Sequence, residues 1–428
     1  MMPNYPVANM NTEEKLIWYA LVFGYVFYLT GMLYIVGSVL GWALFALFLL
    51  RWFVEGKRAA NSALPITVWV WLLGMLMMLV ALLIGHSDFS LGMGLTIKSS
   101  VGWAKGWALL ALFPLLGAMS SIRPQVIVRG VCVLAAQSIP FMLLGLVLVI
   151  AGSDGALYLS PLKAIGGPIS SFEVGLFGIN PETGRARWSF FSPWAPAAGL
   201  MSCLYLIICV NESNRLWRRM GIMGALVMCL FCQSRAGWAI FILLVPALYL
   251  LGQLKQPLLW LLLGTVVSAV CLLGQPLIEG AQTAHQQIKD SRAGSTRVRE
   301  ALATIAIQRW ESEAPIWGHG VVERGPKMVE HMPIGSHHSW YGLLFVKGVV
   351  GLLALAVPLV ITLVYLSADA VNSARSRSAL LVVLVFTGYS FFENLEVLAY
   401  LYWPALIWLG LALNPIKNRE FLSRGVTA

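Results

Sequence analysis

The chain has 428 residues, of which 59% are hydrophobic and 11% are charged, and its formal net charge is +10. This composition leaves too little polar surface for a water-soluble globule, and the apolar runs repeatedly reach bilayer-spanning length. In a soluble domain the excess of Lys and Arg would indicate nucleic-acid binding, but in a membrane protein it first indicates which loops are cytoplasmic.

Hydropathy predicts an all-α polytopic membrane protein that forms a single transmembrane domain over residues 1–428. About twelve spans are expected, with ten to thirteen as the range because the shortest pairs are easily miscounted. Glu13, Glu14 and Lys15 precede the first apolar stretch, so we expect no cleavable signal peptide. The predicted spans cover residues 16–35, 38–54, 65–85, 100–119, 124–151, 193–211, 219–233, 236–252, 257–275, 339–367, 378–392 and 397–413.

The basic residues between these spans predict the orientation. If the N-terminus is cytoplasmic, the loops that follow the even-numbered spans are also cytoplasmic. The basic clusters named below then all stay inside, as the positive-inside rule requires. Both termini are therefore expected in the cytoplasm. The clusters placed inside are Arg51, Lys57 and Arg58; Arg123 and Arg129; Arg215, Arg218 and Arg219; Lys255; Arg375 and Arg377; and Lys417, Arg419 and Arg424.

Two polar segments, 152–192 and 276–337, then fall on the external side. The first is rich in Gly, Ser and Pro and is expected to be loop-like. The second is expected to contain an amphipathic helix over about 297–311. Neither segment is long enough to form an independent catalytic domain, so any active site must be shared with the membrane helices.

Arginine is concentrated on this external side. Arg235, in Gln233-Ser234-Arg235-Ala236-Gly237, lies between two apolar runs, where a charge is costly unless it meets a counter-charge or a water-filled cavity. It either reaches lipid phosphates at the interface or, as we favour, binds a phosphorylated lipid substrate. Several guanidinium groups over the outer leaflet would form a pyrophosphate clamp, because each grips phosphate oxygens bidentately. The other candidates on that side, each of which alone would pass for a solvated loop charge, are Arg185, Arg187, Arg297 and Arg299.

Lys105 lies between two tryptophans near the same predicted surface, and it either extends to the interface or reaches the same anionic site. His337 and His338 stand where the tenth span enters the membrane, and a neutral imidazole there is suited to accept a proton from a hydroxyl group. A structural role is the alternative for both. Glu393, in the last external turn, can orient an imidazole, contact a substrate or simply belong to the turn.

Several common catalytic signatures are absent from the sequence. There is no Asp-x-Asp pair, glycine-rich phosphate loop, Gly-x-Ser-x-Gly elbow or His-Glu-x-x-His motif, which counts against nucleotide-sugar transferases, ATPases, hydrolases and zinc proteases. The paired histidines have no acidic partner at helical spacing, so we predict no metal site. All six cysteines fall in apolar runs and are interpreted as small core residues.

Four elements, in this order, resemble the O-antigen ligase and O-antigen polymerase superfamily of bacterial membrane glycan transferases. They are the turn Ser234-Arg235-Ala-Gly237, the external loop that opens with Arg297 and Arg299, the turn Pro315-Ile-Trp-Gly318-His-Gly320, and the entry at His337 into Lys347-Gly348-Val-Val-Gly351. The motifs cover about 230–355, whereas the hydropathy layout covers the whole chain. Many members have His-Asn where this chain has His337-His338, so both histidines stay candidates for the catalytic position.

The resemblance implies a GT-C-like helical fold in the bacterial inner membrane, with the active site facing the periplasm. It implies a metal-independent, inverting transfer of an oligosaccharide from undecaprenyl pyrophosphate to a glycan hydroxyl, without a cofactor. Arg235 and Arg297 or Arg299 would bind the pyrophosphate, and His337 would activate the acceptor. Trp340 and Tyr341 would contact sugar rings, although either could simply be an interfacial aromatic residue.

Two external loops suit two glycan-bearing substrates, which favours a repeat-unit polymerase over a ligase that acts on lipid A core or a transferase that acts on a protein. The spacing from Arg309 to Gly320 also resembles a pattern of polymerase loops. The alternative from another class is a transporter or flippase. We disfavour it because the charges gather at one interface and are not spread through the bilayer midplane.

Overall fold

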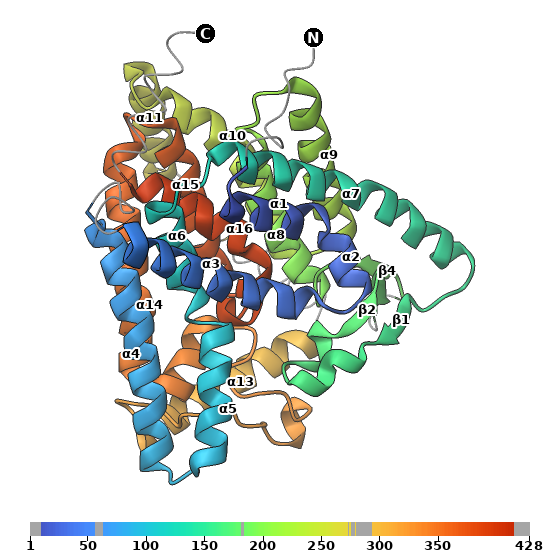
Figure 1. Ribbon diagram of the computed structural model, residues 1–428, viewed down its shortest axis with the longest axis vertical. Helices are drawn as coiled ribbons and strands as arrows, with labels where there is room; N and C mark the ends of the chain where they lie inside the picture. Colours follow the sequence, from blue (N-terminus) through green and yellow to red (C-terminus); the bar gives the residue numbers. More distant parts are fainter. Residues whose placement is uncertain are drawn as a thin grey trace.

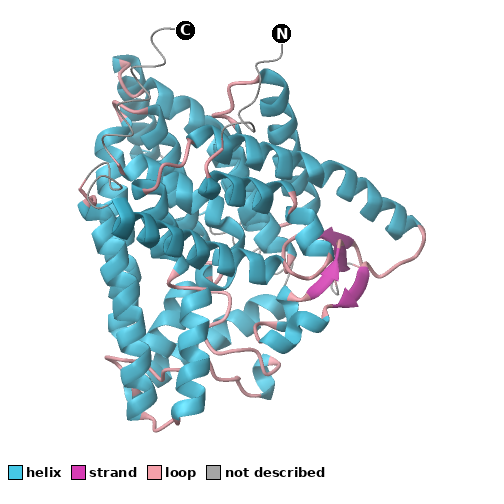
Figure 2. Cartoon of the chain, in the orientation of Figure 1, coloured by secondary structure: helices cyan, strands magenta, loops and turns pink. Residues whose placement is uncertain are grey.

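The computed structural model describes residues 10–55, 63–180, 184–272 and 293–414, together with positions 274 and 279. Helices dominate it and the strands are confined to one edge of the molecule (Figure 2), so the predicted all-α class is confirmed. The helices are α1 Thr12–Val22, α2 Gly24–Leu29, α3 Leu33–Glu55, α4 Ile66–Asp88, α5 Met93–Lys105, α6 Leu109–Met119, α7 Pro124–Ile150, α8 Ala195–Cys209, α9 Arg215–Cys232, α10 Arg235–Leu250, α11 Pro257–Leu272, α13 Ala293–Glu313, α14 Ser339–Ala370, α15 Ala374–Tyr389 and α16 Leu395–Leu413.

Seven helical stretches of the described residues are long and apolar enough to cross a membrane: Leu33–Val54, Ile66–Asp88, Met93–Met119, Pro124–Ile150, Arg235–Gln253, Ser339–Ala370 and Leu395–Leu413. Ala195–Cys209 and Pro257–Cys271 are shorter apolar helices. The predicted number of spans was larger because hydropathy does not register where a helix ends. The predicted span 16–35, for example, is divided into α1, α2 and the start of α3, and Gly31 (φ 70°) turns the chain between the last two.

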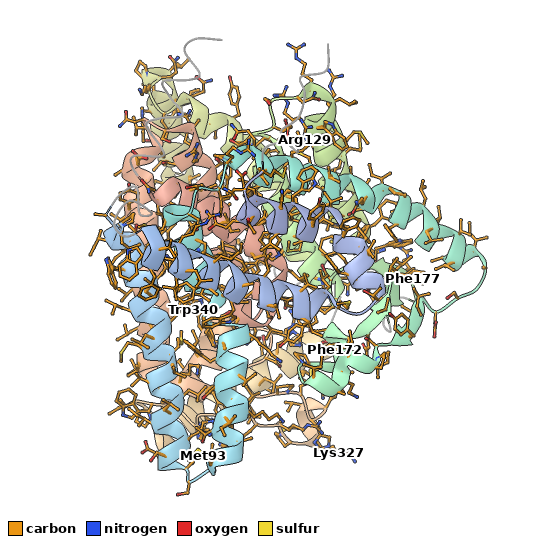
Figure 3. All side chains as sticks on the ribbon, in the orientation of Figure 1. Met93, Arg129, Phe172, Phe177, Lys327 and Trp340 are labelled. Atoms are coloured by element: carbon orange, nitrogen blue, oxygen red, sulfur yellow. The ribbon has the colours of Figure 1, made fainter. Side chains whose placement is uncertain are left out.

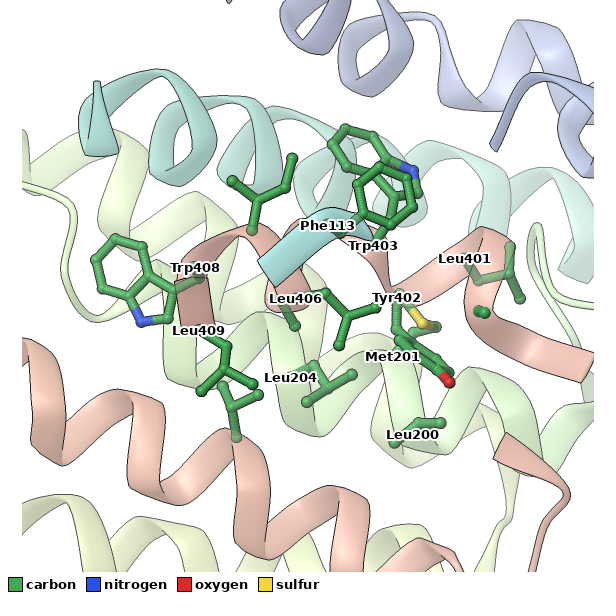
Figure 4. Close-up of a cluster of buried hydrophobic side chains, with 14 of the residues drawn as sticks. Phe113, Leu200, Met201, Leu204, Leu401, Tyr402, Trp403, Leu406, Trp408 and Leu409 are labelled. Carbon is green, nitrogen blue, oxygen red and sulfur yellow. The ribbon is translucent and has the colours of Figure 1, made fainter. Parts of the chain in front are cut away.

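Helix α16 forms the centre of the bundle because it is apolar on all sides and nearly all of its residues are buried. Small residues let its backbone approach α6: a Cβ atom on Gly117 would lie 2.2 Å from the carbonyl oxygen of Ile407, and one on Gly410 would lie 2.1 Å from that of Pro114. Phe113 of α6 stacks on Trp403 of α16 with ring centroids 5.7 Å apart (Figure 4).

Three ion pairs involve arginines of the predicted cytoplasmic clusters. Arg129 of α7 makes a buried two-point contact with Glu212, with both N–O distances at 3.0 Å. Further pairs join Arg51 to Glu13 (3.2 Å) and Arg123 to Glu14 (2.7 Å). Arg129 lies far from Met93 and Lys327 along the long axis of the molecule (Figure 3). Lys57, Arg58, Lys417, Arg419 and Arg424 of these clusters lie outside the described residues.

The two polar segments lie away from the start of α7, where Arg129 lies (Figure 1). The first contains short strands that the sequence did not predict, β1 Ala156–Leu159, β2 Glu173–Gly175, β3 Phe177–Ile179 and β4 Ala186–Trp188, with 3-10 turns at Pro161–Ile165 and Ile169–Ser171. They form two antiparallel hairpins, β1 with β2 and β3 with β4. The helix predicted over 297–311 is present as α13, which is followed by a 3-10 turn at Lys327–Val329. Positions 276–278 and 280–292 of the second segment lie outside the described residues.

The six cysteines are free thiols. Cys132, Cys203, Cys209, Cys229 and Cys232 are buried, as expected for small core residues, whereas Cys271 is exposed on α11. The prediction that all six are core residues is therefore wrong at Cys271. An apolar run on an outer membrane helix directs part of its residues toward lipid, and hydropathy does not separate these from the core residues.

Candidate functional site

Arg235 is the first residue of α10, directly after a sharp turn. Helix α9 ends at Cys232, Gln233 adopts a left-handed conformation (φ 49°), and the Ser234 hydroxyl accepts the Gly237 N–H at 3.2 Å as the N-cap. The Arg235 side chain is exposed. A guanidinium group at the N-terminal end of a helix adds its charge to the positive end of the helix dipole, so this turn attracts anions.

The first polar segment is fastened to this turn. Arg187 of β4 donates a hydrogen bond from Nη2 to the Gln233 carbonyl oxygen at 3.3 Å, and Gln233 donates from Nε2 to the Ala186 carbonyl oxygen at 2.9 Å. Arg185 is exposed two residues before Arg187, on the same face of the extended chain. The structure therefore places the candidate arginines of the first segment next to the Arg235 turn.

The two adjacent histidines have different environments. His338 is the N-cap of α14: its Nδ1 accepts the Tyr341 N–H at 3.4 Å and its ring stacks on Tyr341 with centroids 3.9 Å apart. His337 adopts a left-handed backbone conformation (φ 62°), which is uncommon for a residue other than glycine and typical of functional sites. The His338 side chain thus caps the start of α14. The preceding residue, His337, is distinguished by its left-handed backbone conformation.

Arg299 of α13 interacts electrostatically with both His337 and Glu393. Burial, reinforced by the positive charge of Arg299, lowers the pKa of His337 to about 4. Burial raises the pKa of Glu393 to about 7, against the opposing effects of Arg299 and of the Trp194 indole, which donates to its Oε2 at 3.1 Å. Burial also lowers the pKa of His338 to about 4. At neutral pH both imidazoles are therefore unprotonated.

The turn between α15 and α16 is bound tightly to the start of α14. The Ser339 hydroxyl donates to the Glu393 carbonyl oxygen at 2.7 Å and accepts the Leu395 N–H at 3.0 Å. The Trp340 indole donates to the Ser390 hydroxyl at 2.9 Å. These contacts fix the Glu393 backbone relative to the histidines, and they give Trp340 a structural role in addition to any contact with substrate.

The same turn also reaches the Arg235 group. Glu393 donates its N–H to the Tyr389 carbonyl oxygen at 2.8 Å. A Cβ atom on Gly237 would lie 3.1 Å from the Tyr389 hydroxyl, and one on Gly199 of α8 would lie 2.9 Å from it and 3.0 Å from Cβ of Ser234. Segment 389–394 therefore contacts both the Arg235 turn and the His337 region, which brings the two groups into one site.

The two candidate arginines of α13 differ in position. Arg299 is exposed and lies one turn before the buried Leu302. Arg297 is exposed two residues earlier, on a different face. Lys105 donates to the Gly166 carbonyl oxygen of the first polar segment at 3.3 Å and lies over the Tyr34 ring of α3.

The Pro315–Gly320 turn is inserted into a break in α14. Gly348 is non-helical (φ 60°, ψ −162°), and on either side of it the inserted turn supplies the missing hydrogen bonds. His319 and Gly320 donate their N–H groups to the carbonyl oxygens of Phe345 and Val346 at 2.9 Å, and the N–H groups of Val349 and Val350 bind the carbonyl oxygens of Pro315 and Ile316 at 3.0 and 3.3 Å. The close approach of the two backbones explains why Gly318 of the turn occurs together with Gly348 of the helix.

An ionic network that we did not predict anchors α13 to this insertion. Arg309 binds Glu313 (2.7 Å) and Glu323 (2.5 Å), and its guanidinium carbon lies 5.1 Å from the centre of the Phe345 ring. Glu313 also binds Nε2 of the buried His319 at 2.7 Å, and Arg309 and His319 together lower the pKa of Glu313 to about 2. The Arg309-to-Gly320 spacing was the one available signal for this network.

Among the described residues, no group of three His, Cys, Asp or Glu side chains could hold a metal ion. The cationic groups of the site are the guanidinium groups of Arg187, Arg235 and Arg299. They occur together with the neutral imidazoles of His337 and His338 and the buried carboxyl group of Glu393. This arrangement can bind an anionic ligand and accept a proton beside it.

The fold thus defines a membrane-embedded helical protein, with a candidate site of arginines, histidines and a buried carboxyl group. Residues 220–356 match the family model of O-antigen ligases. The matched segment contains the Arg235 turn, α13, the insertion and the start of α14, and it supports the resemblance to the O-antigen ligase and polymerase superfamily. No curated protein matches the sequence significantly. The family supports glycan transfer of the ligase or polymerase type from lipid-linked substrates.

Proposed function

We propose that the protein transfers an oligosaccharide from undecaprenyl pyrophosphate to a hydroxyl group of an acceptor glycan, as a repeat-unit polymerase of the bacterial inner membrane with its site facing the periplasm. The observation that carries the proposal is the position of Arg299 beside both His337 and Glu393. It combines an anion-binding group with a neutral base, and the segment 389–394, which carries Glu393, also contacts the Arg235 turn.

In the proposed reaction the acceptor hydroxyl loses its proton to the His337 imidazole as its oxygen attacks the anomeric carbon of the donor sugar. The bond from that carbon to the pyrophosphate oxygen breaks, and the electron pair leaves with the pyrophosphate. Arg235 and Arg299 stabilise the negative charge that develops there. A single displacement of this kind inverts the anomeric configuration and needs no cofactor or metal ion.

In this scheme Glu393 stabilises the protonated form of His337. The imidazolium formed on His337 lies near the positive charge of Arg299, which is unfavourable unless a carboxylate compensates. The buried Glu393 carboxyl group supplies that charge when ionised, and its hydrogen bond from Trp194 orients it. His338 keeps the start of α14 in place, and Trp340 and Tyr341 border the same region.

The attachment of the first polar segment to the Arg235 turn supports polymerase over ligase activity. Both polar segments contribute arginines to one site, which suits two substrates that each carry a glycan. A ligase that acts on lipid A core is the second candidate, and the match of residues 220–356 to the O-antigen ligase family supports it.

The test is a gel of the cell-surface polysaccharide from a deletion strain complemented with wild type or with His337→Asn. A polymerase predicts that the variant reduces the ladder to a single repeat unit. A ligase predicts that all polymer is lost from lipid A core and accumulates on the lipid carrier. An unchanged ladder would refute the proposed role of His337, and flux of the lipid-linked glycan without bond formation would favour a flippase.

A further inference from the structure

A cavity of about 590 Å³ lies between the two hairpins of the first polar segment and the start of α8. Asp154, Tyr158, Glu173 and Ser192 are among the residues that line it. Its volume is in the range of sites that bind small-molecule ligands. The cavity is separate from His337 and Arg299, and no sequence motif pointed to it.

The wall of this cavity combines an aromatic ring with fixed polar groups. The Tyr158 ring is held by the Leu29 carbonyl oxygen, which accepts its hydroxyl hydrogen at 2.5 Å, and the residue remains 43% exposed. The carboxylates of Asp154 and Glu173 are acceptors on the exposed part of the wall. Ser192 is 1% exposed, and its hydroxyl has no hydrogen-bond partner among the described residues. A buried hydroxyl group of this kind favours a ligand that can donate to it or accept from it.

Two residues join the cavity to the proposed active site. Arg187 lines the cavity and donates to the Gln233 carbonyl oxygen beside Arg235. Trp194 lines the cavity and donates to the buried carboxyl group of Glu393. A ligand in the cavity would therefore end next to the elements that hold His337.

The charges of the wall limit the class of ligand. Asp154 and Glu173 face one guanidinium group, that of Arg187, so the cavity does not favour the pyrophosphate of the donor. Carboxylates accept hydrogen bonds from hydroxyl groups, and a fixed aromatic ring provides an apolar contact. These features fit the hydroxyl-rich but partly apolar surface of a sugar.

We propose that the cavity between the hairpins is a glycan subsite that binds the acceptor chain and presents its terminal hydroxyl group to His337. The assignment rests on the proposed transfer function, because it is that function which makes the ligand the acceptor glycan. Glu173, Asp154 and Ser192 bind sugar hydroxyl groups, and Tyr158 contacts a sugar face.

The binding test uses the full-length protein in lipid nanodiscs. The probe is a mixture of short oligosaccharides released by mild acid from the surface polysaccharide of the host strain, and saturation-transfer NMR measures its binding. We expect Glu173→Gln to weaken binding about tenfold and Ser192→Ala about fivefold, since each removes one hydrogen bond to the ligand. Glu311→Gln, an exposed carboxylate of α13 outside the cavity, is the matched control and should leave binding unchanged.

The outcomes separate this proposal from the transfer function. His337→Asn should bind the probe as wild type does while it transfers nothing. Unchanged binding by both cavity variants, or no binding by wild type, would overturn the subsite and leave the role of His337 intact. Full transfer by His337→Asn would overturn the function instead. In steady state the cavity variants should raise KM for the acceptor; a rise in KM for the donor alone would overturn the assignment to the acceptor.

Discussion

Substitution by Asn should abolish activity at His337 and preserve it at His338. Asn can adopt the left-handed conformation that the structure requires at His337, so His337→Asn keeps the backbone and removes the base. Asn is also a preferred N-cap residue, so His338→Asn keeps the hydrogen bond to the Tyr341 N–H. We expect the first variant to be inactive and the second to be active.

The expected magnitudes follow from the two roles. A positioned general base contributes about 100- to 10,000-fold to the rate, so His337→Asn should lower kcat by that factor with little change in thermal stability. His338→Asn should stay within about threefold of wild type, because a change in N-cap strength of about 0.5 kcal/mol corresponds to a small factor. His338→Ala removes both the cap and the stacking on Tyr341, and it should destabilise the protein by about 1 kcal/mol.

The assay is glycan transfer by the purified variants in nanodiscs, with thermal unfolding of each variant followed by intrinsic fluorescence. Measuring both properties separates loss of the base from loss of the fold. Equal loss of activity in folded His337→Asn and His338→Asn would refute the assignment of the base to His337. An active His337→Asn with an inactive His338→Asn would reverse the two roles.

Three further predictions concern the anionic ligand, the buried carboxyl group and the helix break. Arg299→Ala should raise KM for the donor by about tenfold or more, because it loses a charge-assisted hydrogen bond. Arg297→Ala, on another face of α13, should change this KM by less than about threefold. Donor titrations of both variants measure the difference. In wild type kcat/KM should rise with pH through about 7 as Glu393 ionises. Glu393→Gln should lose this rise and keep only the rise near pH 4 that reflects deprotonation of His337. A pH series of kcat/KM for both proteins would show the difference. Gly348→Ala should lower the unfolding temperature markedly, because its Cβ atom would lie 2.2 Å from a carbonyl oxygen of the inserted turn, whereas Gly264→Ala meets nothing within 4 Å and serves as the control.

The parts of the structure that the sequence predicted are those set by local composition. The helical class follows from apolar runs, and α13 was found because Val298, Leu302 and Ala306 recur at helical spacing. The positive-inside rule assigned the candidate arginines to one side. In the structure Arg187 bonds to the Arg235 turn, and Arg299 interacts with Glu393, whose segment contacts that turn. Each of these inferences depends only on residues that are close to each other in the sequence.

The parts that were missed depend on contacts between distant residues. The hairpins have strands of three or four residues, too short for an alternating pattern to be visible. The hydrogen bonds between Arg187 and Gln233 join residues 46 positions apart, and only the fold reveals them. The insertion of the Pro315–Gly320 turn was invisible because α14 reads as one continuous apolar run across Gly348.

The network around Arg309 gives a physical reason for the position of Arg299. Helix α13 runs parallel to the start of α14, with Arg309 over the Phe345 ring at one end and Arg299 beside His337 at the other. Because the ion pairs at Glu313 and the insertion at Gly348 fix one end of α13, its rigid helix fixes the other. The helix break therefore sets the distance between the anion-binding group and the base.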